Sequence, residues 1–378
     1  MKKIKILQIL SDTNIGGAGR LLYNLAESID NDEFEFIYVF PRGSELCKLF
    51  SEQNHKNKIY TISNGRDRSF DFRAATEIKR IIKATQPHII HTHSSLFARI
   101  GACLAGFDKK RVVYTKHCVF DLPVITKYKV FRCLYRRLDN LLADHIIAVA
   151  ESAKDELCAY GVDDNKIKVI INGVKPLRES SAEEKEELRE KLGINKKTLI
   201  VGMSARLESY KGHKTLIKAA ALLKEKGIDD ISFLILGDGS YAEELKNYTE
   251  ALNVSDRIFF LGFMENVAEY VNIFDINVNC STGTETSSLA ISEGLSLGKP
   301  AIVSDFGGNP NMVKNYETGF VIKQNDAHVL ADKILYLKSN PDTLKYMSNN
   351  ARLDFKERFS ADIMARKYEC FYRVIEIK

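Results

Sequence analysis

The sequence predicts an α/β protein made of two domains, each built on a parallel β-sheet. Short apolar runs alternate with amphipathic helical stretches along the whole chain, as where 4–10 is followed by 19–29. Strands that are apolar on both faces and joined by crossover helices are typical of parallel sheets. A length of 378 residues fits two domains of roughly 100–200 residues each. The turn signal Asn172-Gly173, with Pro176 close behind, marks the boundary.

The individual elements follow from the spacing of the apolar residues. Residues 1–172 form the predicted first domain and residues 173–358 the second. Strands are expected at 4–10, 34–40, 58–62, 89–92, 112–115, 146–150 and 168–171, then at 199–203, 232–236, 258–261, 276–279, 301–303 and 320–322. Helices are expected between them, including 19–29, 74–85, 130–142, 181–192, 214–226, 242–252, 289–297 and 327–340. A final amphipathic helix, 359–378, must pack on another element, and the first domain is a candidate.

Composition excludes several classes of protein. No apolar run approaches the roughly 18 residues that a membrane span needs. The charged start Met1-Lys2-Lys3 does not fit a signal peptide, so we expect a cytoplasmic protein. The seven cysteines include no C-x-x-C pair, which argues against a disulfide framework and against a zinc site.

Positive charge is concentrated in the first domain. The net charge is +5, and residues 1–170 carry 27 Lys and Arg against 20 Asp and Glu. This charge, with the basic amphipathic segment 127–137, suits an anionic partner such as a membrane surface or a phosphorylated acceptor. An ordinary solvated surface explains it equally well. No nucleic acid partner is expected.

A glycine-rich loop, Ile15-Gly16-Gly17-Ala18-Gly19, follows the first strand and opens a helix. Paired glycines there let backbone N–H groups approach a phosphate closely, although a tight structural turn is the alternative. The loop is not a dinucleotide fingerprint, because Leu22 stands where G-x-G-x-x-G needs its last glycine.

Two loops of the second domain carry charged residues at the carboxyl ends of strands, where parallel sheets bind ligands. Arg206 and Lys211 follow the strand at 199–203. Two converging cations suit a diphosphate leaving group. Glu285 and Glu293 follow the strand at 276–279, where carboxylates can accept hydrogen bonds from sugar and ribose hydroxyls. Solvated surface charges are the alternative reading of both loops.

Together these motifs resemble, in order and spacing, the large glycosyltransferase family 4, whose GT-B fold has two Rossmann-like domains facing a cleft. The resemblance covers nearly the whole chain. Glu285 and Glu293 meet the family's E-x7-E signature, and a Gly-Gly turn stands at 307–308. Other matching pieces lie at 91–95, 114–117, 147–152, 171–174 and 236–239.

The resemblance implies a retaining hexosyltransferase that uses a nucleotide sugar, most simply UDP-linked, and needs no metal or other cofactor. Arg206 and Lys211 would hold the donor diphosphate, Glu285 would face the donor sugar, and Glu293 the ribose. His117 matches the family's active-site histidine, which contacts the transferred sugar. The other donor-binding positions that carry over are Gly16, Gly17, Gly237, Thr286, Ser287, Ser288 and Leu289.

The acceptor side is assigned to the first domain, with His93 and Arg20 as contacts. The resemblance implies a glycan or lipid-linked acceptor in cell-envelope or exopolysaccharide synthesis. We therefore expect peripheral contact with the inner face of an anionic membrane. It also implies that the C-terminal helix crosses back to the first domain.

The chain departs from the family pattern after the first glutamate. Thr286-Ser287-Ser288 stand where the family usually has Gly-aromatic-Gly, so the identity of the donor sugar is open. Asn311 stands where an acid often follows the proline, which is read as variation.

No metal site is predicted at the histidines His88, His91 and His93. No carboxylate or thiolate lies nearby in the sequence, and strand alternation places His88 on the face opposite the other two. Two other functions remain open. The broken glycine fingerprint argues against an NAD-dependent dehydrogenase. The retained charged residues of the second domain argue against a non-catalytic homologue that only binds nucleotide sugar.

Overall fold

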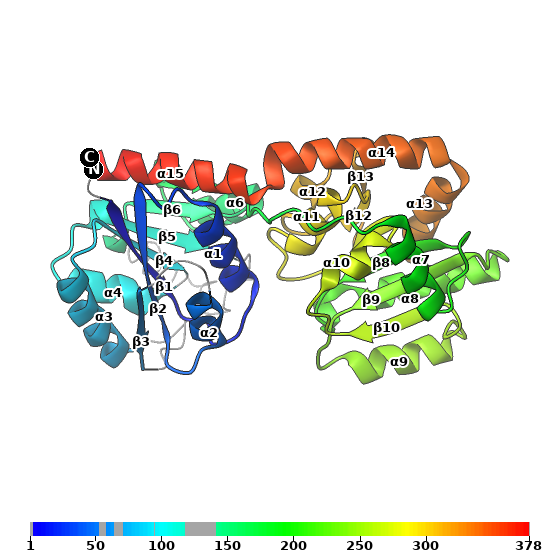
Figure 1. The fold of residues 1–378 in the computed structure, drawn as a ribbon, viewed down its shortest axis with the longest axis horizontal. Helices are drawn as coiled ribbons and strands as arrows, with labels where there is room; N and C mark the ends of the chain where they lie inside the picture. Colours follow the sequence, from blue (N-terminus) through cyan, green and yellow to red (C-terminus); the bar gives the residue numbers. More distant parts are fainter. Residues whose placement is uncertain (1–2, 53–57, 64–70, 94, 118–140, 378) are drawn as a thin grey trace. The chain divides into compact units, whose positions relative to one another are not determined.

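The computed structural model describes residues 3–52, 58–63, 71–93, 95–117 and 141–377. The chain forms two compact units, one of Met1–Gly173 with Ala361–Lys378 and one of Val174–Ser360. The sequence placed the boundaries after 172 and after 358. Each unit is a parallel sheet with helices packed on it (Figure 1). The predicted fold class, two parallel-sheet α/β domains, is therefore confirmed.

In the part of the first unit that the structure describes, the sheet has seven strands in the order β3-β2-β1-β4-β5-β6-β7, and all neighbours run parallel. Every strand lies within two residues of its predicted position. The strands are β1 (Ile4–Leu10), β2 (Phe34–Pro41), β3 (Lys58–Ile62), β4 (Ile89–His93), β5 (Val112–Lys116), β6 (His145–Ala148) and β7 (Ile167–Val169).

Both faces of this sheet are covered because successive side chains along a strand point to opposite faces. In β1, Ile6 packs in the cluster that contains α1 (Gly17–Ser28), α2 (Glu45–Ser51) and α15 (Ala361–Ile377). The next residue, Leu7, packs in the cluster that contains α3 (Phe72–Thr85) and α4 (Leu96–Leu104). The helix α6 (Glu151–Ala159) packs on β6 and β7. The helix predicted at 130–142 falls mostly outside the described residues.

The C-terminal helix α15 belongs to the first unit, as the resemblance implied. Its stripe of buried residues joins the side chains of α1, β1 and β2 in one cluster. The stripe consists of Met364, Ala365, Tyr368, Tyr372 and Ile375. The amphipathic pattern of the final stretch thus predicted the helix, and the resemblance implied its partner.

The second unit has a six-stranded parallel sheet in the order β10-β9-β8-β11-β12-β13. Its central neighbours β8, β11 and β12 end at the same edge, which places the loops that follow them side by side. The strands are β8 (Leu199–Ser204), β9 (Ile231–Leu236), β10 (Ile258–Gly262), β11 (Ile276–Asn279), β12 (Ala301–Ser304) and β13 (Gly319–Ile322).

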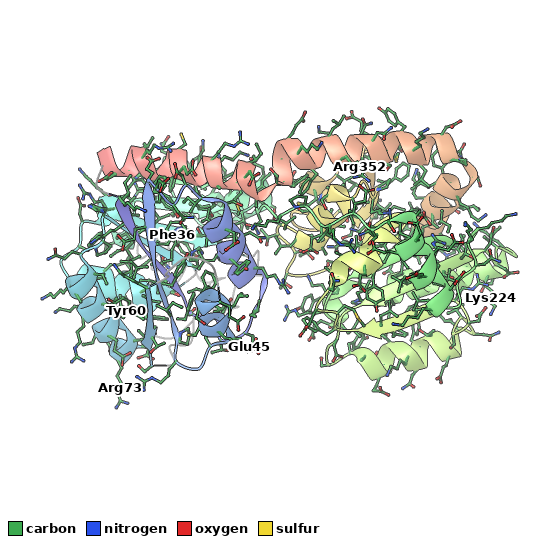
Figure 2. All side chains as sticks on the ribbon, viewed as in Figure 1. Phe36, Glu45, Tyr60, Arg73, Lys224 and Arg352 are labelled. Carbon is green, nitrogen blue, oxygen red and sulfur yellow. The ribbon has the colours of Figure 1, made fainter. Side chains whose placement is uncertain are left out.

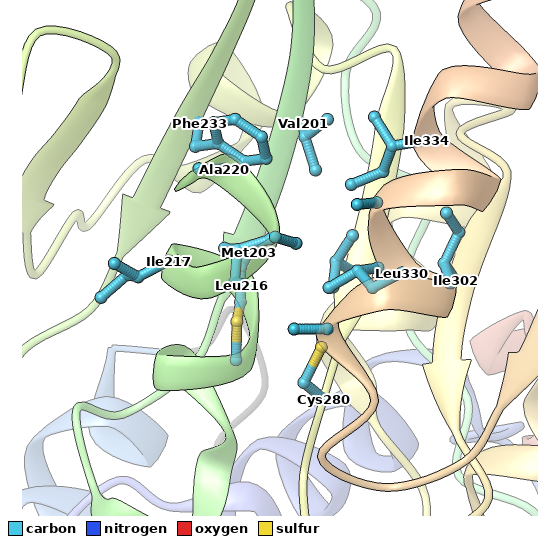
Figure 3. Packing of buried hydrophobic residues seen from close by; sticks show 14 of the residues in the cluster. Val201, Met203, Leu216, Ile217, Ala220, Phe233, Cys280, Ile302, Leu330 and Ile334 are labelled. Carbon is cyan, nitrogen blue, oxygen red and sulfur yellow. The ribbon is translucent and has the colours of Figure 1, made fainter. Parts of the chain in front are cut away.

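One face of this sheet packs against α8 (His213–Glu225) and α13 (Ala327–Ser339). Figure 3 shows Leu216 and Ile217 of α8 and Leu330 of α13 packed around Met203 of β8. On the other face lie α7 (Ala182–Lys191) and α10 (Val267–Asn272). The remaining helices are α9 (Ala242–Ala251), α11 (Leu289–Ser296), α12 (Asn309–Met312) and α14 (Pro341–Asp354). Among the described residues, no helix has the length and apolar character needed to cross a membrane.

Candidate active site

Lys211 and Glu285 form an ion pair at the carboxyl edge of the second unit's sheet. Lys211 Nζ lies 2.8 Å from Glu285 Oε2, and the two side chains are only 13% and 11% exposed. Asn279 Nδ2 and Ser281 Oγ also donate to Oε2, each at 3.1 Å. Within the described part of the chain, no residue donates to Oε1. One carboxylate oxygen is therefore held in place while the other is left for a ligand.

Two glycines allow these loops to approach each other. Gly212 has a φ of +79°, and a Cβ there would lie 1.9 Å from the carbonyl oxygen of Cys280. Gly307 has a φ of +57°, and its Cβ would lie 2.0 Å from the carbonyl oxygen of Glu285. Glycine adopts positive φ readily and has no Cβ to collide. The contacts hold the loop of Lys211 and the Gly-Gly turn against the segment that carries Glu285.

Arg206 lies on the same loop as Lys211 and is exposed to solvent. Its Nη2 donates to Tyr210 Oη at 3.0 Å, and no carboxylate of the described residues forms an ion pair with it. The Tyr210 carbonyl accepts a 2.7 Å hydrogen bond from the N–H of Thr282, which ties the cationic loop to the one that carries Glu285. The loop thus carries one cation in an ion pair, Lys211, and one solvent-exposed cation, Arg206. Such a pair of cations suits a diphosphate.

The segment 286–288 leads from Glu285 into α11. Ser288 is the N-cap, and its Oγ accepts from the N–H of Ile291 at 3.4 Å and from Asn279 Nδ2 at 3.1 Å. Glu293 lies half-buried on the second turn of this helix. Backbone N–H groups at a helix N-terminus favour negative charge. The segment therefore adds partial positive charge beside Lys211 and Glu285.

In the first unit, Gly16 and Gly17 lie where β1 leads into α1. A Cβ at Gly17 would meet no protein atom within 4 Å, and one at Gly16 would come no closer than 3.9 Å to Asp12. Glu45, labelled in Figure 2, accepts a 3.2 Å hydrogen bond from the N–H of Ile15 and ties the loop to the start of α2. Packing thus requires neither glycine, and the loop backbone is accessible to a ligand.

Three histidines, two from β4 and one directly after β5, form a polar cluster in which His91 and His93 are buried and His117 is half-buried. The rings of His91 and His93 stack with centroids 4.4 Å apart. His93 Nδ1 lies 2.8 Å from His117 Nε2, and His93 Nε2 lies 2.9 Å from Gln8 Oε1. Burial lowers the pKa of His91 to about 3 and that of His117 to about 4, and holds the pKa of His93 well below its usual value. All three rings are therefore neutral at neutral pH.

A second branch of this cluster starts from the other end of the Gln8 amide. Gln8 Nε2 donates to Tyr372 Oη at 3.1 Å. Tyr372 Oη lies 2.7 Å from His91 Nδ1, and His91 Nε2 lies 2.6 Å from Thr115 Oγ1. Because Tyr372 belongs to α15, the C-terminal helix supplies a polar group to this cluster as well as apolar packing.

Known proteins match the chain over almost its full length. The model of Glycosyltransferase Family 4 matches residues 15–178, and that of Glycosyl transferases group 1 matches residues 184–354. An Escherichia coli relative, UDP-Gal:alpha-D-GlcNAc-diphosphoundecaprenol alpha-1,3-galactosyltransferase, is 30% identical over 93% of this chain and 92% of its own. The chain belongs to glycosyltransferase family 4.

Solved structures agree with this family assignment. A glycosyltransferase from Rickettsia africae ESF-5 superposes on this glycosyltransferase with a TM-score of 0.85, at 25% identity over 99% of each chain. Anabaena HepE, solved in complex with UDP-glucose, superposes with a TM-score of 0.83, at 21% identity over 98% of this chain and 99% of its own. The fold is therefore GT-B, and the chain is a glycosyltransferase enzyme. The dehydrogenase alternative is wrong.

The positions predicted in the second unit of the glycosyltransferase fall at one edge of its sheet. Lys211 pairs with Glu285, and Arg206 lies on the same loop as Lys211. Gly237 follows β9 with a φ of +136°, and its N–H donates to the carbonyl of Gly262 at 2.8 Å. The loop after β9 is thus fixed to the end of β10.

The first unit requires one correction. The sequence placed His93 at a rim where it could contact the acceptor, but its side chain is fully buried and both ring nitrogens face Gln8 or His117. The reason is that β4 is a central strand whose face is covered by α15. Arg20, the other predicted acceptor contact, is exposed on the first turn of α1.

Several residues that shape the site were missed from the sequence. Asn279 and Ser281 hold Glu285, and Gln8 and Tyr372 connect the histidines. The available signal was a polar side chain inside an otherwise apolar strand, as with Gln8 in the first strand. Buried polar groups need hydrogen-bond partners, so such residues point to a polar network.

Proposed function

We propose that this glycosyltransferase moves a sugar from a UDP-sugar to a lipid-linked or glycan acceptor, with retention of the anomeric configuration. The observation that carries the proposal is the Lys211–Glu285 ion pair, with Arg206 on the same loop. Two relatives support UDP as the carrier, because HepE was solved with UDP-glucose and the E. coli enzyme is named for UDP-Gal. The latter name also supports a lipid-linked acceptor, since it specifies a diphosphoundecaprenol.

In the proposed complex, each charged group has one role. Arg206 and Lys211 bind the diphosphate, and Glu285 accepts a hydrogen bond from a hydroxyl of the donor sugar through its Oε1. Glu293 takes the ribose hydroxyls. Because Lys211 already neutralises Glu285, the carboxylate can lie beside the diphosphate without repelling it strongly.

The chemical step breaks the bond between the anomeric carbon and the diphosphate oxygen. Negative charge then builds up on the leaving phosphate. Arg206, Lys211 and the N–H groups at the start of α11 are placed to stabilise that charge, and each well-placed donor contributes about 3–4 kcal/mol in such sites. The proposal includes no metal ion, because these groups supply the positive charge.

A donor and acceptor screen tests the proposal. The full-length enzyme is incubated with UDP-glucose, UDP-galactose, UDP-N-acetylglucosamine or GDP-mannose, with and without a polyprenyl-diphosphate-linked sugar. We expect nucleotide release from one UDP-sugar that depends on the acceptor, and an α-linked product by NMR. Release only from the GDP-sugar, a β-linked product, or no acceptor-dependent release would contradict the proposal.

Peripheral membrane contact is a further part of the proposal. It is supported by the basic first half of the sequence and by the lipid-linked acceptor of the E. coli relative. The basic segment 127–137 lies outside the described residues, so the argument rests on its sequence alone. Flotation with anionic vesicles should recover the wild type and lose a variant with Lys127, Lys129 and Arg132 changed to Glu. Equal recovery of the two would contradict membrane contact.

A further inference from the structure

The orientation of the Gln8 side chain determines where protons lie in the histidine cluster. A side-chain amide has one end that only accepts hydrogen bonds and one that only donates them. The accepting end, Oε1, lies 2.9 Å from His93 Nε2, and the donating end, Nε2, lies 3.1 Å from Tyr372 Oη. Because Oε1 can only accept, His93 carries a proton on Nε2.

The proton on His93 determines the one on His117. A neutral imidazole carries a single N–H, and His93 is neutral because burial holds its pKa well below the usual value. Its Nδ1 therefore presents a lone pair, and this atom lies 2.8 Å from His117 Nε2. For the two nitrogens to bond, His117 must donate from Nε2, which leaves its Nδ1 unprotonated.

The other branch is consistent with the same orientation. Tyr372 Oη accepts from Gln8 Nε2, so its own hydrogen is available for His91 Nδ1 at 2.7 Å. His91 then carries its proton on Nε2 and donates to Thr115 Oγ1 at 2.6 Å. Each bond in both branches has one donor and one acceptor. Rotating the Gln8 amide by half a turn would exchange donor and acceptor in every hydrogen bond of both branches. The orientation of Gln8 therefore determines which ring nitrogens carry protons.

We infer that Gln8 is a positioning residue which, through His93, fixes His117 as a neutral hydrogen-bond acceptor at Nδ1 for a hydroxyl group of the substrate. The inference rests on the proposed function for the identity of that substrate, whereas the tautomer follows from the orientation of the Gln8 amide. No described residue bonds to His117 Nδ1. In this form His117 accepts from a sugar hydroxyl and does not donate a proton to the leaving phosphate.

The tautomer can be measured without any assay of activity. In the full-length protein labelled with 15N-histidine, two-bond 1H–15N correlation spectra at pH 7 distinguish protonated from unprotonated ring nitrogens. We expect a single tautomer at His117, protonated on Nε2. A proton on Nδ1 in the wild type would overturn the inference directly.

Two variants separate Gln8 from the rest of the cluster. Gln8→Met has a similar length but neither accepts nor donates through an amide, so we expect exchange-averaged nitrogen signals at His117. Thr115→Val is the matched control, because it removes a buried hydrogen bond of the His91 branch and should leave the His117 tautomer unchanged. An unchanged single tautomer in Gln8→Met, or an equal change in Thr115→Val, would refute the role of Gln8.

Turnover then links the tautomer to the reaction. With the donor identified by the screen, Gln8→Met should lower kcat by about tenfold, the fold-change that the loss of one hydrogen bond gives, and leave the donor KM within about twofold. Normal kcat with a mixed tautomer would overturn the substrate role of His117. A fixed tautomer in a wild type that transfers no sugar would instead refute the proposed function and leave the tautomer assignment intact.

Discussion

Individual side chains at the charged edge of the second unit differ in what their removal would cost. Lys211 and Glu285 are largely buried and partnered, so loss of either leaves the other unpaired in a poorly solvated place. Arg206 is exposed and bonds only to the hydroxyl of Tyr210 among the described residues. Removal of Arg206 is therefore the cleaner test of function.

Arg206→Ala should reduce sugar transfer at least tenfold without measurable loss of stability. The physical reason is that a charged donor aimed at a leaving phosphate contributes about 3–4 kcal/mol, whereas exposed substitutions usually change stability by less than about 0.5 kcal/mol. Arg73→Ala is the control, because Arg73 projects into solvent from α3 of the first unit (Figure 2). Initial rates and urea unfolding measure the two effects, and unchanged turnover in Arg206→Ala would contradict the assigned role.

The buried histidines should make the protein sensitive to acid. The pKa of His91 is about 3 in the folded protein and about 6.5 when unfolded, so between these values the unfolded state binds more protons. The unfolding free energy should therefore fall as pH drops from about 6.5 toward 3, with each such histidine contributing a slope of up to about 1.4 kcal/mol per pH unit.

This pH dependence can be assigned to one side chain. In urea titrations between about pH 4 and 6.5, the unfolding free energy of His91→Gln should depend less steeply on pH than that of the wild type. The difference in slope should correspond to about one bound proton. His328→Gln is the control, since His328 is exposed on α13. Equal slopes in the wild type and His91→Gln would show that His91 does not stay neutral in the folded protein.

At the scale of elements, two glycines at opposite ends of α8 permit a sharp comparison. Both have positive φ, +79° at Gly212 and +72° at Gly227. A Cβ at Gly212 would lie 1.9 Å from the Cys280 carbonyl, whereas one at Gly227 would meet nothing within 4 Å. The two alanine variants thus share backbone strain but differ in collision with the loop that leads to Glu285.

Gly227→Ala should cost about 1–2 kcal/mol, the strain of an L-residue in the left-handed region. Gly212→Ala should cost at least about 2 kcal/mol more, because a backbone atom must move to admit the Cβ. It should also weaken UDP binding about tenfold, since Lys211 is the adjacent residue. Calorimetric titration with UDP measures the affinity. Equal affinity in the two variants would show that the contact with Cys280 does not position Lys211.

The elements themselves were predictable from the sequence, but the contacts between them were only partly so. Apolar runs predicted all thirteen strands of the described residues, since burial on both faces leaves a clear pattern. The placement of Lys211 and Glu285 at one edge of the second sheet was also predictable, because both follow strands whose carboxyl ends form that edge. The link from Gln8 to His93 was not, because it depends on β1 lying beside β4, with Leu10 level with His93. Strand order and register of this kind are set by the whole sheet.

At the scale of the whole molecule, the first unit is discontinuous in sequence. Its last helix, α15, follows the entire second unit along the chain. That helix buries Tyr368 and Tyr372 completely in the first unit's core. The first unit therefore cannot complete its core until α15 has been made.

Tyr372→Ala should destabilise the first unit selectively. Loss of a fully buried aromatic side chain costs about 3–5 kcal/mol, and here it also removes the hydroxyl that bonds to Gln8 and His91. Hydrogen exchange monitored by mass spectrometry should show faster exchange in β1 and β4, whereas the strands of the second unit, which α15 does not complete, should keep their protection.

The exposed face of the same helix supplies the control for this experiment. Val374 is 48% exposed, so Val374→Ala keeps the helix and removes far less packing than Tyr372→Ala. It should leave exchange unchanged in both units.

If Tyr372→Ala accelerated exchange equally in β1 and in β8, the two units would unfold as one cooperative block. Acceleration confined to the first unit would instead mean that the second unit stays folded when the histidine cluster is lost. Under the proposed function, UDP binding should then survive in Tyr372→Ala while sugar transfer fails.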